Sequence, residues 1–274
     1  MVSRRLAVLA IVATTGLSAC SGWMHDDPPS ERSGLKDVVT GPARTPAETA
    51  RDPYRHPYEA LAFWGVKPGD AIVEIWPGGG YWTEMLAPYA KATGGTYIAA
   101  LPSRTRGLPE RFANKSVYGE IGTTVFDKSS GPLVPAGTAD FILTARNIHD
   151  WVGTPGMPER AFRDFYAALK PGGILAVEQH RSDPRPMKPD GSDGYLSTAY
   201  VVKVATDAGF KLAAQSEINA NPKDTKDHPF GVWTLPPTRR SAPSGQPANP
   251  NFDHSKYDAI GESDRMTLRF MKPM

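Results

Sequence analysis

An apolar segment that runs directly into a glycine-rich loop limits the fold of this chain more than any other feature. Residues 71–75 read Ala-Ile-Val-Glu-Ile, without the polar alternation of a half-exposed strand, so both faces of the predicted strand should be buried. Residues 76–81, Trp-Pro-Gly-Gly-Gly-Tyr, follow directly. Glycine at the end of a buried strand lets the backbone approach a ligand closely. We therefore expect a ligand-binding loop, or alternatively a tight turn that binds nothing.

Strand-like and helix-like segments alternate from this loop to the end of the chain. Further strands are predicted at residues 96–100, 123–126, 139–144, 174–177 and 210–214, with helices at 158–169 and 198–208. This alternation favours a mostly parallel sheet that is covered by helices on both faces. Residues 266–271 predict a seventh strand, and its position after a long loop fits an antiparallel partner.

This architecture resembles the class I S-adenosylmethionine-dependent methyltransferases, and so do the loop at residues 74–81 and the string Lys-Pro-Gly-Gly at residues 170–173. The resemblance implies an α/β, Rossmann-like fold with a seven-stranded, mostly parallel sheet and one late antiparallel strand. It implies S-adenosylmethionine as cofactor, with the loop around the methionine and ribose portions and Glu74 organising the loop and the methionyl amine. The cofactor contacts that it implies are Glu74, Pro77, Gly78, Gly79, Gly80, Tyr81, Asp127 and Arg146.

Three positions bear on how the cofactor would bind. Trp76 stands where the family usually has a further glycine, which narrows the loop or moves an indole against the ligand. The second predicted strand ends in Leu101 and offers no acid for the ribose hydroxyls. Asp127 resembles the family's contact to the adenine amino group, or it caps a turn. Trp76 and the missing acid favour an alternative function, in which the protein keeps the fold, catalyses no reaction, and binds another ligand or a protein partner.

Candidate catalytic residues follow the fourth and fifth predicted strands, at the carboxyl edge of the sheet where open α/β folds bind ligands. The resemblance places Asn147 and His149 beside the transferring methyl group. His149 is the first candidate for a base, because a histidine can take a proton from an oxygen or nitrogen nucleophile near neutral pH. Alternatively, His149 hydrogen-bonds backbone at a strand end. His180 completes the candidate set, and no local spacing predicts a metal site.

The first residues predict export. Arg4 and Arg5 precede an apolar run at residues 6–16, which is shorter than the roughly 20 residues of a membrane-spanning helix. The string Leu-Ser-Ala-Cys20 resembles the lipobox of bacterial lipoproteins, so residues 1–19 would be a signal peptide and Cys20 would carry a lipid anchor. Ser21 then implies a periplasm-facing protein in the outer membrane of a Gram-negative bacterium. The alternatives are an ordinary secretory signal with an incidental cysteine, or a twin-arginine signal.

The rest of the chain is predicted as a tether followed by one domain. Residues 20–56 carry prolines among polar residues and no sustained apolar period, which is typical of a flexible tether. Residues 57–274 would form the methyltransferase-like domain, with a proline-rich loop at 236–250. The formal net charge of +2 falls to zero once Arg4 and Arg5 are removed, so no nucleic-acid partner is predicted. The expected function is an envelope-anchored methyltransferase. Its acceptor, a small molecule or an envelope component, and its oligomeric state are left open.

Overall fold

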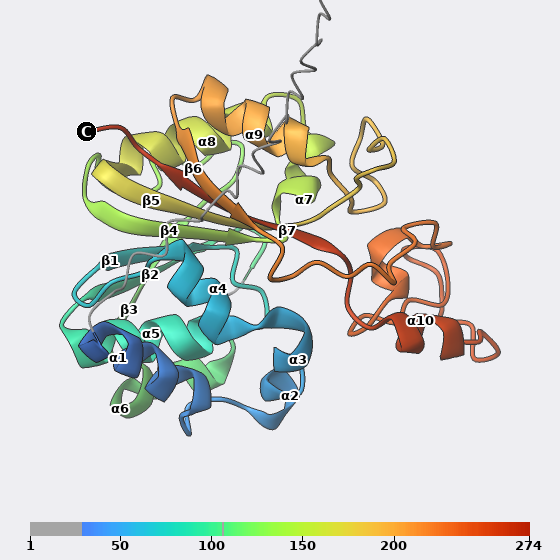
Figure 1. Cartoon of the computed structure of the whole chain (residues 1–274), viewed down its shortest axis with the longest axis horizontal. Helices are drawn as coiled ribbons and strands as arrows, with labels where there is room; N and C mark the ends of the chain where they lie inside the picture. Colours follow the sequence, from blue (N-terminus) through green and yellow to red (C-terminus); the bar gives the residue numbers. More distant parts are fainter. Residues whose placement is uncertain (1–28, 106) are drawn as a thin grey trace, which may run out of the picture.

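The structure is a computed structural model that describes residues 29–105 and 107–274 (Figure 1). The predicted signal peptide and the lipid anchor at Cys20 lie outside the described residues. In the described ranges, no helix combines the length and apolar character that a membrane span requires.

One seven-stranded sheet organises the chain (Figure 1). Its order is β3-β2-β1-β4-β5-β7-β6, and all neighbours are parallel except β7, which pairs antiparallel with both β5 and β6. The predicted seven-stranded sheet with a late antiparallel strand is confirmed. The strands are β1 (Ala71–Ile75), β2 (Thr96–Leu101), β3 (Ile121–Val125), β4 (Ala139–Ala145), β5 (Leu169–His180), β6 (Lys211–Ser216) and β7 (Arg265–Met271).

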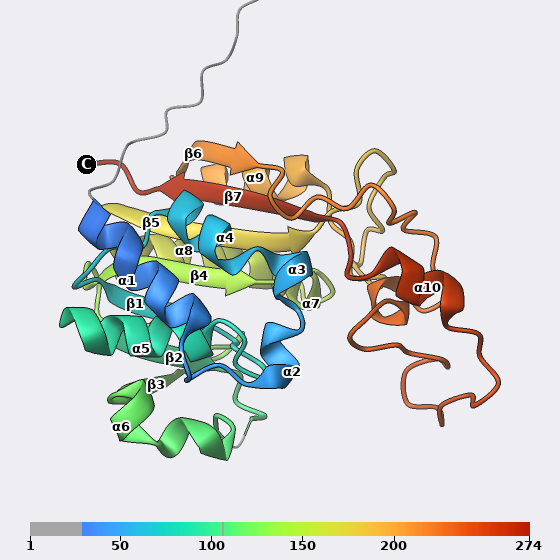
Figure 2. The same ribbon diagram turned by 60° about the horizontal axis from the view of Figure 1, so that its bottom comes forward.

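Helices cover both faces of the sheet, and two hydrophobic cores result (Figures 1 and 2). One face carries α1 (Pro29–Thr40), α4 (Pro57–Trp64) and α5 (Thr83–Thr93), and the other carries α7 (Ile148–Val152), α8 (Met157–Ala168) and α9 (Thr198–Asp207). Within β4, Phe141 and Leu143 join the first core while Ile142 joins the second. Because side chains alternate across a strand and both faces are covered, β1 and β4 are mostly apolar, the exceptions being Glu74 in β1 and Asp140 and Thr144 in β4.

Residues 29–56 were predicted to be part of a flexible tether, and this prediction is wrong, because they form helices that pack on the domain. After α1 come α2 (Pro46–Thr49) and α3 (Asp52–Arg55), and Leu35 and Val38 are buried in the core that contains α4 and α5. The prolines of α2 and α3 sit in the first helical turn, where a missing N–H leaves no bond unmade. Proline content therefore did not exclude helix here.

The Lys-Pro-Gly-Gly string at residues 170–173 precedes the predicted strand at 174–177 and is itself part of β5 in the structure. The strand starts at Leu169, with Gly172 at a φ of 77° and a register shift between Ala139 and Phe141 of β4. The strand therefore begins irregularly and becomes regular at Ile174, where the sequence predicted its start.

The segment between β6 and β7 lies beyond the carboxyl ends of the parallel strands (Figures 1 and 2). It contains the short helices η2 (Gly231–Thr234) and α10 (Ser255–Ile260), and residues 236–250 form neither helix nor strand. Asp224 anchors this insertion, because its carboxylate accepts hydrogen bonds from Tyr195, His228 and the backbone N–H groups of Lys226 and Asp264. The insertion thereby reaches the edge of the sheet where the candidate site residues converge.

Candidate active site

A cavity of about 300 Å³ opens at the carboxyl edge of the sheet. This volume lies within the range of small-molecule sites, which is roughly 300–1,000 Å³. The loop after β1, the segment after β4, the end of β5, the β6–β7 insertion and the region of α2 and α3 contribute to its wall. The structure brings most of the predicted site residues together there: Glu74, Pro77, Gly78, Gly79, Tyr81, Arg146, Asn147, His149 and His180.

Two predicted cofactor contacts, Gly80 and Asp127, do not line this cavity. Gly80 has a φ of 92°, and a Cβ there would lie 2.3 Å from Cζ of Phe112, so packing of Phe112 requires the glycine. Asp127 caps the turn after β3, because its Oδ1 accepts the N–H groups of Ser129 and Ser130. A hydrogen bond from the Ser103 side chain, followed by these bonds from Ser129 and Ser130, lowers the pKa of Asp127 to about 2.

Glu74 connects β1, β2 and α5 beneath the loop. Its Oε2 accepts hydrogen bonds from the hydroxyls of Thr83 at 2.9 Å and Tyr97 at 2.5 Å. Burial raises the pKa of Glu74 to about 7, and the two hydrogen bonds oppose that shift. Glu74 therefore organises the loop from below while it also lines the cavity.

Trp76 lies across the end of β2. Its backbone N–H donates to the carbonyl of Ala100 in β2, and its indole Nε1–H donates to the carbonyl of Phe126 just after β3, both at 2.8 Å. The indole packs edge-on against Trp151, with centroids 5.6 Å apart, and the guanidinium of Arg104 lies 5.2 Å from the ring centroid. The backbone of Trp76 has a φ of 47°, a conformation that favours glycine.

Gln179 determines which nitrogen of His149 carries the proton. The amide nitrogen of Gln179 donates to the carbonyl of Gly194 at 3.0 Å and lies 3.1 Å from Nδ1 of His149. Since a carbonyl can only accept, this orientation makes Nδ1 of His149 the acceptor and assigns its proton to Nε2. That nitrogen lies 3.5 Å from Oδ1 of Asp150. His149 therefore presents a hydrogen-bond donor rather than a lone pair to the cavity.

His180 lies beside His149, with ring centroids 5.4 Å apart. Its Nδ1 is 2.5 Å from Oγ of Ser263, and its Nε2 has no hydrogen-bond partner among the residues that the structure describes. Burial lowers the pKa of His149, and burial together with the charges of His149 and Arg265 lowers the pKa of His180 well below its ordinary value. Both imidazoles are therefore neutral near pH 7.

Asn147 is a cavity residue whose side chain has a local structural role. Its amide nitrogen donates to the carbonyl of Ile75 at 2.6 Å and so ties the segment after β4 to the end of β1. Across the described ranges, no cluster of three His, Cys, Asp or Glu side chains has metal-binding geometry.

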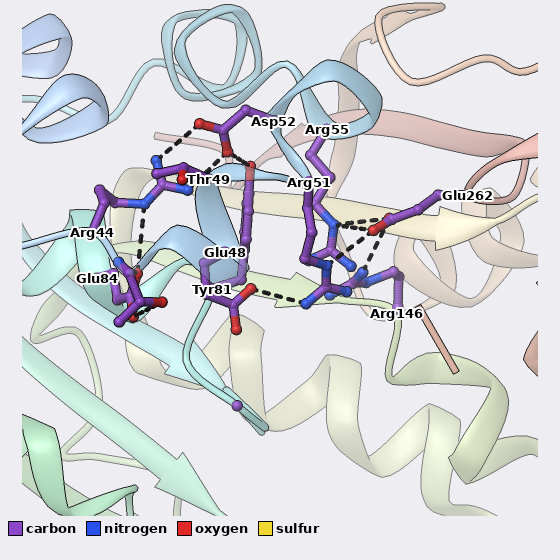
Figure 3. A network of polar contacts seen from close by, with 12 residues as sticks. Arg44, Glu48, Thr49, Arg51, Asp52, Arg55, Tyr81, Glu84, Arg146 and Glu262 are labelled. Atoms are coloured by element: carbon purple, nitrogen blue, oxygen red, sulfur yellow. Dashed lines mark hydrogen bonds and ion pairs between the residues drawn. The ribbon is translucent and has the colours of Figure 1, made fainter. Parts of the chain in front are cut away.

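A network of arginines and glutamates lies on the cavity wall, and the sequence had pointed only to its Arg146 (Figure 3). Arg51 bridges Glu48, at 2.9 Å, to Glu262, at 3.0 Å, and Arg146 also points toward Glu262, at 3.8 Å. Beneath the cavity wall, Arg55 and Arg265 bind the same Glu262 carboxylate at 2.8 and 2.6 Å. Glu48 lies in α2 and Arg55 in α3, with Arg51 between the two helices, so no periodic pattern within one element indicated this network.

Comparison with known proteins identifies the fold. No family model matches the chain. The solved structure of the [4+2]-cyclase SpnF aligns with a TM-score of 0.54 at 14% identity, covering 88% of this chain and 93% of SpnF. A protein of Galdieria sulphuraria assigned as a sarcosine dimethylglycine methyltransferase aligns at 0.50 and 13% identity, covering 80% and 88%. This chain has the class I methyltransferase fold. SpnF, a cyclase by name, shows that this fold alone does not determine a reaction.

One relative by sequence supports the resemblance to class I S-adenosylmethionine-dependent methyltransferases. The ubiquinone/menaquinone biosynthesis C-methyltransferase UbiE of Hydrogenovibrio crunogenus is 23% identical over 137 residues, which are 50% of this chain and 52% of UbiE. The chain thus spans about half the length of this relative.

Proposed function

We propose that the chain is an S-adenosylmethionine-dependent methyltransferase of the bacterial cell envelope, whose acceptor binds between His149, His180 and Trp233. The observation that carries this proposal is the convergence of the loop after β1 with two neutral imidazoles in a single cavity. S-adenosylmethionine, when bound, supplies an electrophilic methyl group. The wall around the imidazoles would hold the acceptor in line with that group, because positioning accounts for much of the rate of such a displacement.

The residues present fit the methionine half of this cofactor. Glu74 and Glu48 offer carboxyl groups for an ammonium group, Arg51 and Arg146 offer guanidiniums for a carboxylate, and all four line the cavity. A side chain at Gly78 would point into open space, since no atom lies within 4 Å of a Cβ built there. The nucleoside half instead meets Trp76, which lies across the end of β2.

His180 is a better candidate for the base than His149. A base needs an unprotonated nitrogen that faces the acceptor. Gln179 places the His149 proton on Nε2, so His149 is suited to donate a hydrogen bond to the acceptor. His180 can donate from Nδ1 to Ser263, which leaves the lone pair of Nε2 free to take the acceptor's proton.

Calorimetric titration of the purified protein with S-adenosylmethionine and S-adenosylhomocysteine tests the proposal. We expect micromolar binding in the wild type and none in Gly78→Arg, whose side chain fills the loop side of the cavity. Gly94→Arg is the matched control, because Gly94 also has positive φ and open space but ends α5 away from the cavity. Millimolar or absent binding to the wild type would contradict the cofactor assignment.

Anchoring in the envelope is a separate part of the proposal and rests on the lipobox-like string that ends in Cys20. Cells that express the full chain would be labelled with a palmitate analogue and compared with cells that express Cys20→Ala. Label should be lost in the variant, and equal labelling would exclude the anchor. Fractionation of the labelled cells then tests the outer membrane as its location.

A second candidate function is ligand binding without methyl transfer. Trp76 at the end of β2 favours it, because the indole lies where the resemblance expects ribose. Under this alternative, S-adenosylmethionine and S-adenosylhomocysteine would not bind to the wild type in the calorimetric titration.

A further inference from the structure

We infer that Trp76 is the specificity-determining residue of this cavity: its indole fills a nucleoside subsite in the free protein, and a nucleoside-bearing ligand binds only by displacing it. The inference deepens the proposed function and rests on it for the identity of the ligand. Small ligands then reach the amino-acid half of the cavity directly, whereas a ligand enters the nucleoside half only when the Trp76 side chain moves.

The indole of Trp76 lies across the end of β2. In the sheet, β2 lies between β1 and β3. Trp76 starts at the end of β1, bonds the carbonyl of Ala100 in β2, and reaches the carbonyl of Phe126 after β3. In nucleotide-binding α/β folds, the nucleoside lies over the carboxyl end of this second strand. A nucleoside and the indole would therefore compete for the same space.

The indole makes the contacts that a purine base would make in this subsite. The ring is planar, donates one N–H to the carbonyl of Phe126, and packs edge-on against Trp151. Arg104 lies over it at cation–π distance. Trp76 lines the cavity, whereas Leu101, Ser103 and Asp127 at the ends of β2 and β3 do not. The cavity thus stops at the indole.

The backbone conformation at Trp76 is one that suits glycine. Its φ of 47° is a conformation that glycine adopts without strain, so Trp76→Gly should keep the loop intact while it empties the subsite. The indole is partly exposed and is held by one hydrogen bond and ring contacts, with no buried ion pair. These contacts are weak enough for a ligand to replace.

The test measures three ligands on the full-length purified protein: S-adenosylhomocysteine, 5′-methylthioadenosine for the nucleoside half and L-methionine for the amino-acid half. Compared with the wild type, Trp76→Gly should bind both nucleoside ligands at least about tenfold more tightly, and L-methionine with unchanged affinity. Trp76→Phe keeps a ring in the subsite and serves as the matched control, with affinities closer to those of the wild type.

A second measurement covers the case that Trp76→Gly fails to fold. In wild-type protein labelled with 5-fluorotryptophan, the fluorine resonance that Trp76→Phe removes should shift on saturation with S-adenosylhomocysteine and stay in place with L-methionine. An unmoved resonance at saturation, or equal nucleoside affinity in the wild type and Trp76→Gly, would overturn the inference while the proposed cofactor stands. Binding of 5′-methylthioadenosine but not S-adenosylhomocysteine to Trp76→Gly would support the subsite and overturn the proposed cofactor.

Discussion

The two sides of the cavity are built on opposite electrostatic principles. On the charged side, Glu48, Arg51, Arg146 and Glu262 form ion pairs of 2.9 to 3.8 Å with one another. On the imidazole side, which consists of His149, His180, Ser263 and Trp233, polarity comes from uncharged groups held by hydrogen bonds and ring contacts. A buried charge needs a partner of opposite sign, whereas a buried neutral imidazole needs only a donor or an acceptor. The two sides should therefore respond differently to mutation and to pH.

The largest expected effect comes from breaking the buried ion pairs that lie beneath the charged side of the cavity. Arg265, with its side chain 1% exposed, bridges Glu262 and Glu178, and Arg265→Met leaves the Glu178 carboxylate buried without a cation. We expect unfolding free energy to fall by about 3–5 kcal/mol in a urea titration. Arg239→Met is the control, because the pair of Arg239 with Asp258 is exposed, and its loss should be below about 1 kcal/mol. Equal losses would contradict the proposed importance of burial.

Glu74 provides a pH test on the loop side. Its pKa is raised by burial from the ordinary 4.5 to about 7, so the folded protein keeps a proton that the unfolded chain releases between these values. Stability relative to Glu74→Gln should therefore fall as pH rises from 4.5 to 7, by about 3 kcal/mol in total. Urea titrations of both proteins at several pH values measure this, and a constant difference would contradict it.

His180 provides the opposite pH test on the imidazole side. Burial, with the charges of His149 and Arg265, holds its pKa well below 6.5, so below pH 6.5 the unfolded chain takes up a proton that the folded protein refuses. Relative to His180→Gln, the wild type should lose up to about 1.4 kcal/mol per pH unit as pH falls below 6.5. If the difference instead grew in favour of the wild type on acidification, a charged His180 would be indicated.

The smallest effect is expected where the charged side reaches solvent. Arg51 is 21% exposed and links Glu48 to Glu262, so Arg51→Gln should cost about 0.5–1 kcal/mol, and less in high salt. Lys203→Gln, which removes an exposed ion pair on α9, is the matched control and should change stability less. A salt-independent loss at Arg51 would show that its packing against Tyr81 matters more than its charge.

The local pattern of apolar residues and glycines in the sequence predicted much of the fold. The unbroken apolar run at residues 71–75 predicted a strand buried on both faces, and four of the five residues of β1 are buried, the first being partly exposed. The position of the loop after that strand also predicted the edge at which the site lies. Local pattern was less informative for residues 29–56, because helices begun by proline and held by distant partners have no sustained apolar period. Arg55, for example, is buried by an ion pair with a residue more than 200 positions away.

By itself, the sequence determined the alternation of strands and helices from residue 71 onward and the sheet edge at which polar residues converge, and the family resemblance added the late antiparallel strand. The alternation follows from side-chain periodicity, and the position of the loop follows from its glycines, which are properties of neighbouring residues. Only the tertiary structure decided which histidine carries a free nitrogen, that Glu262 gathers four arginines, and that Trp76 spans the end of β2. Each depends on partners distant in the chain, because packing, burial and the direction of a hydrogen bond are set by what the fold brings together.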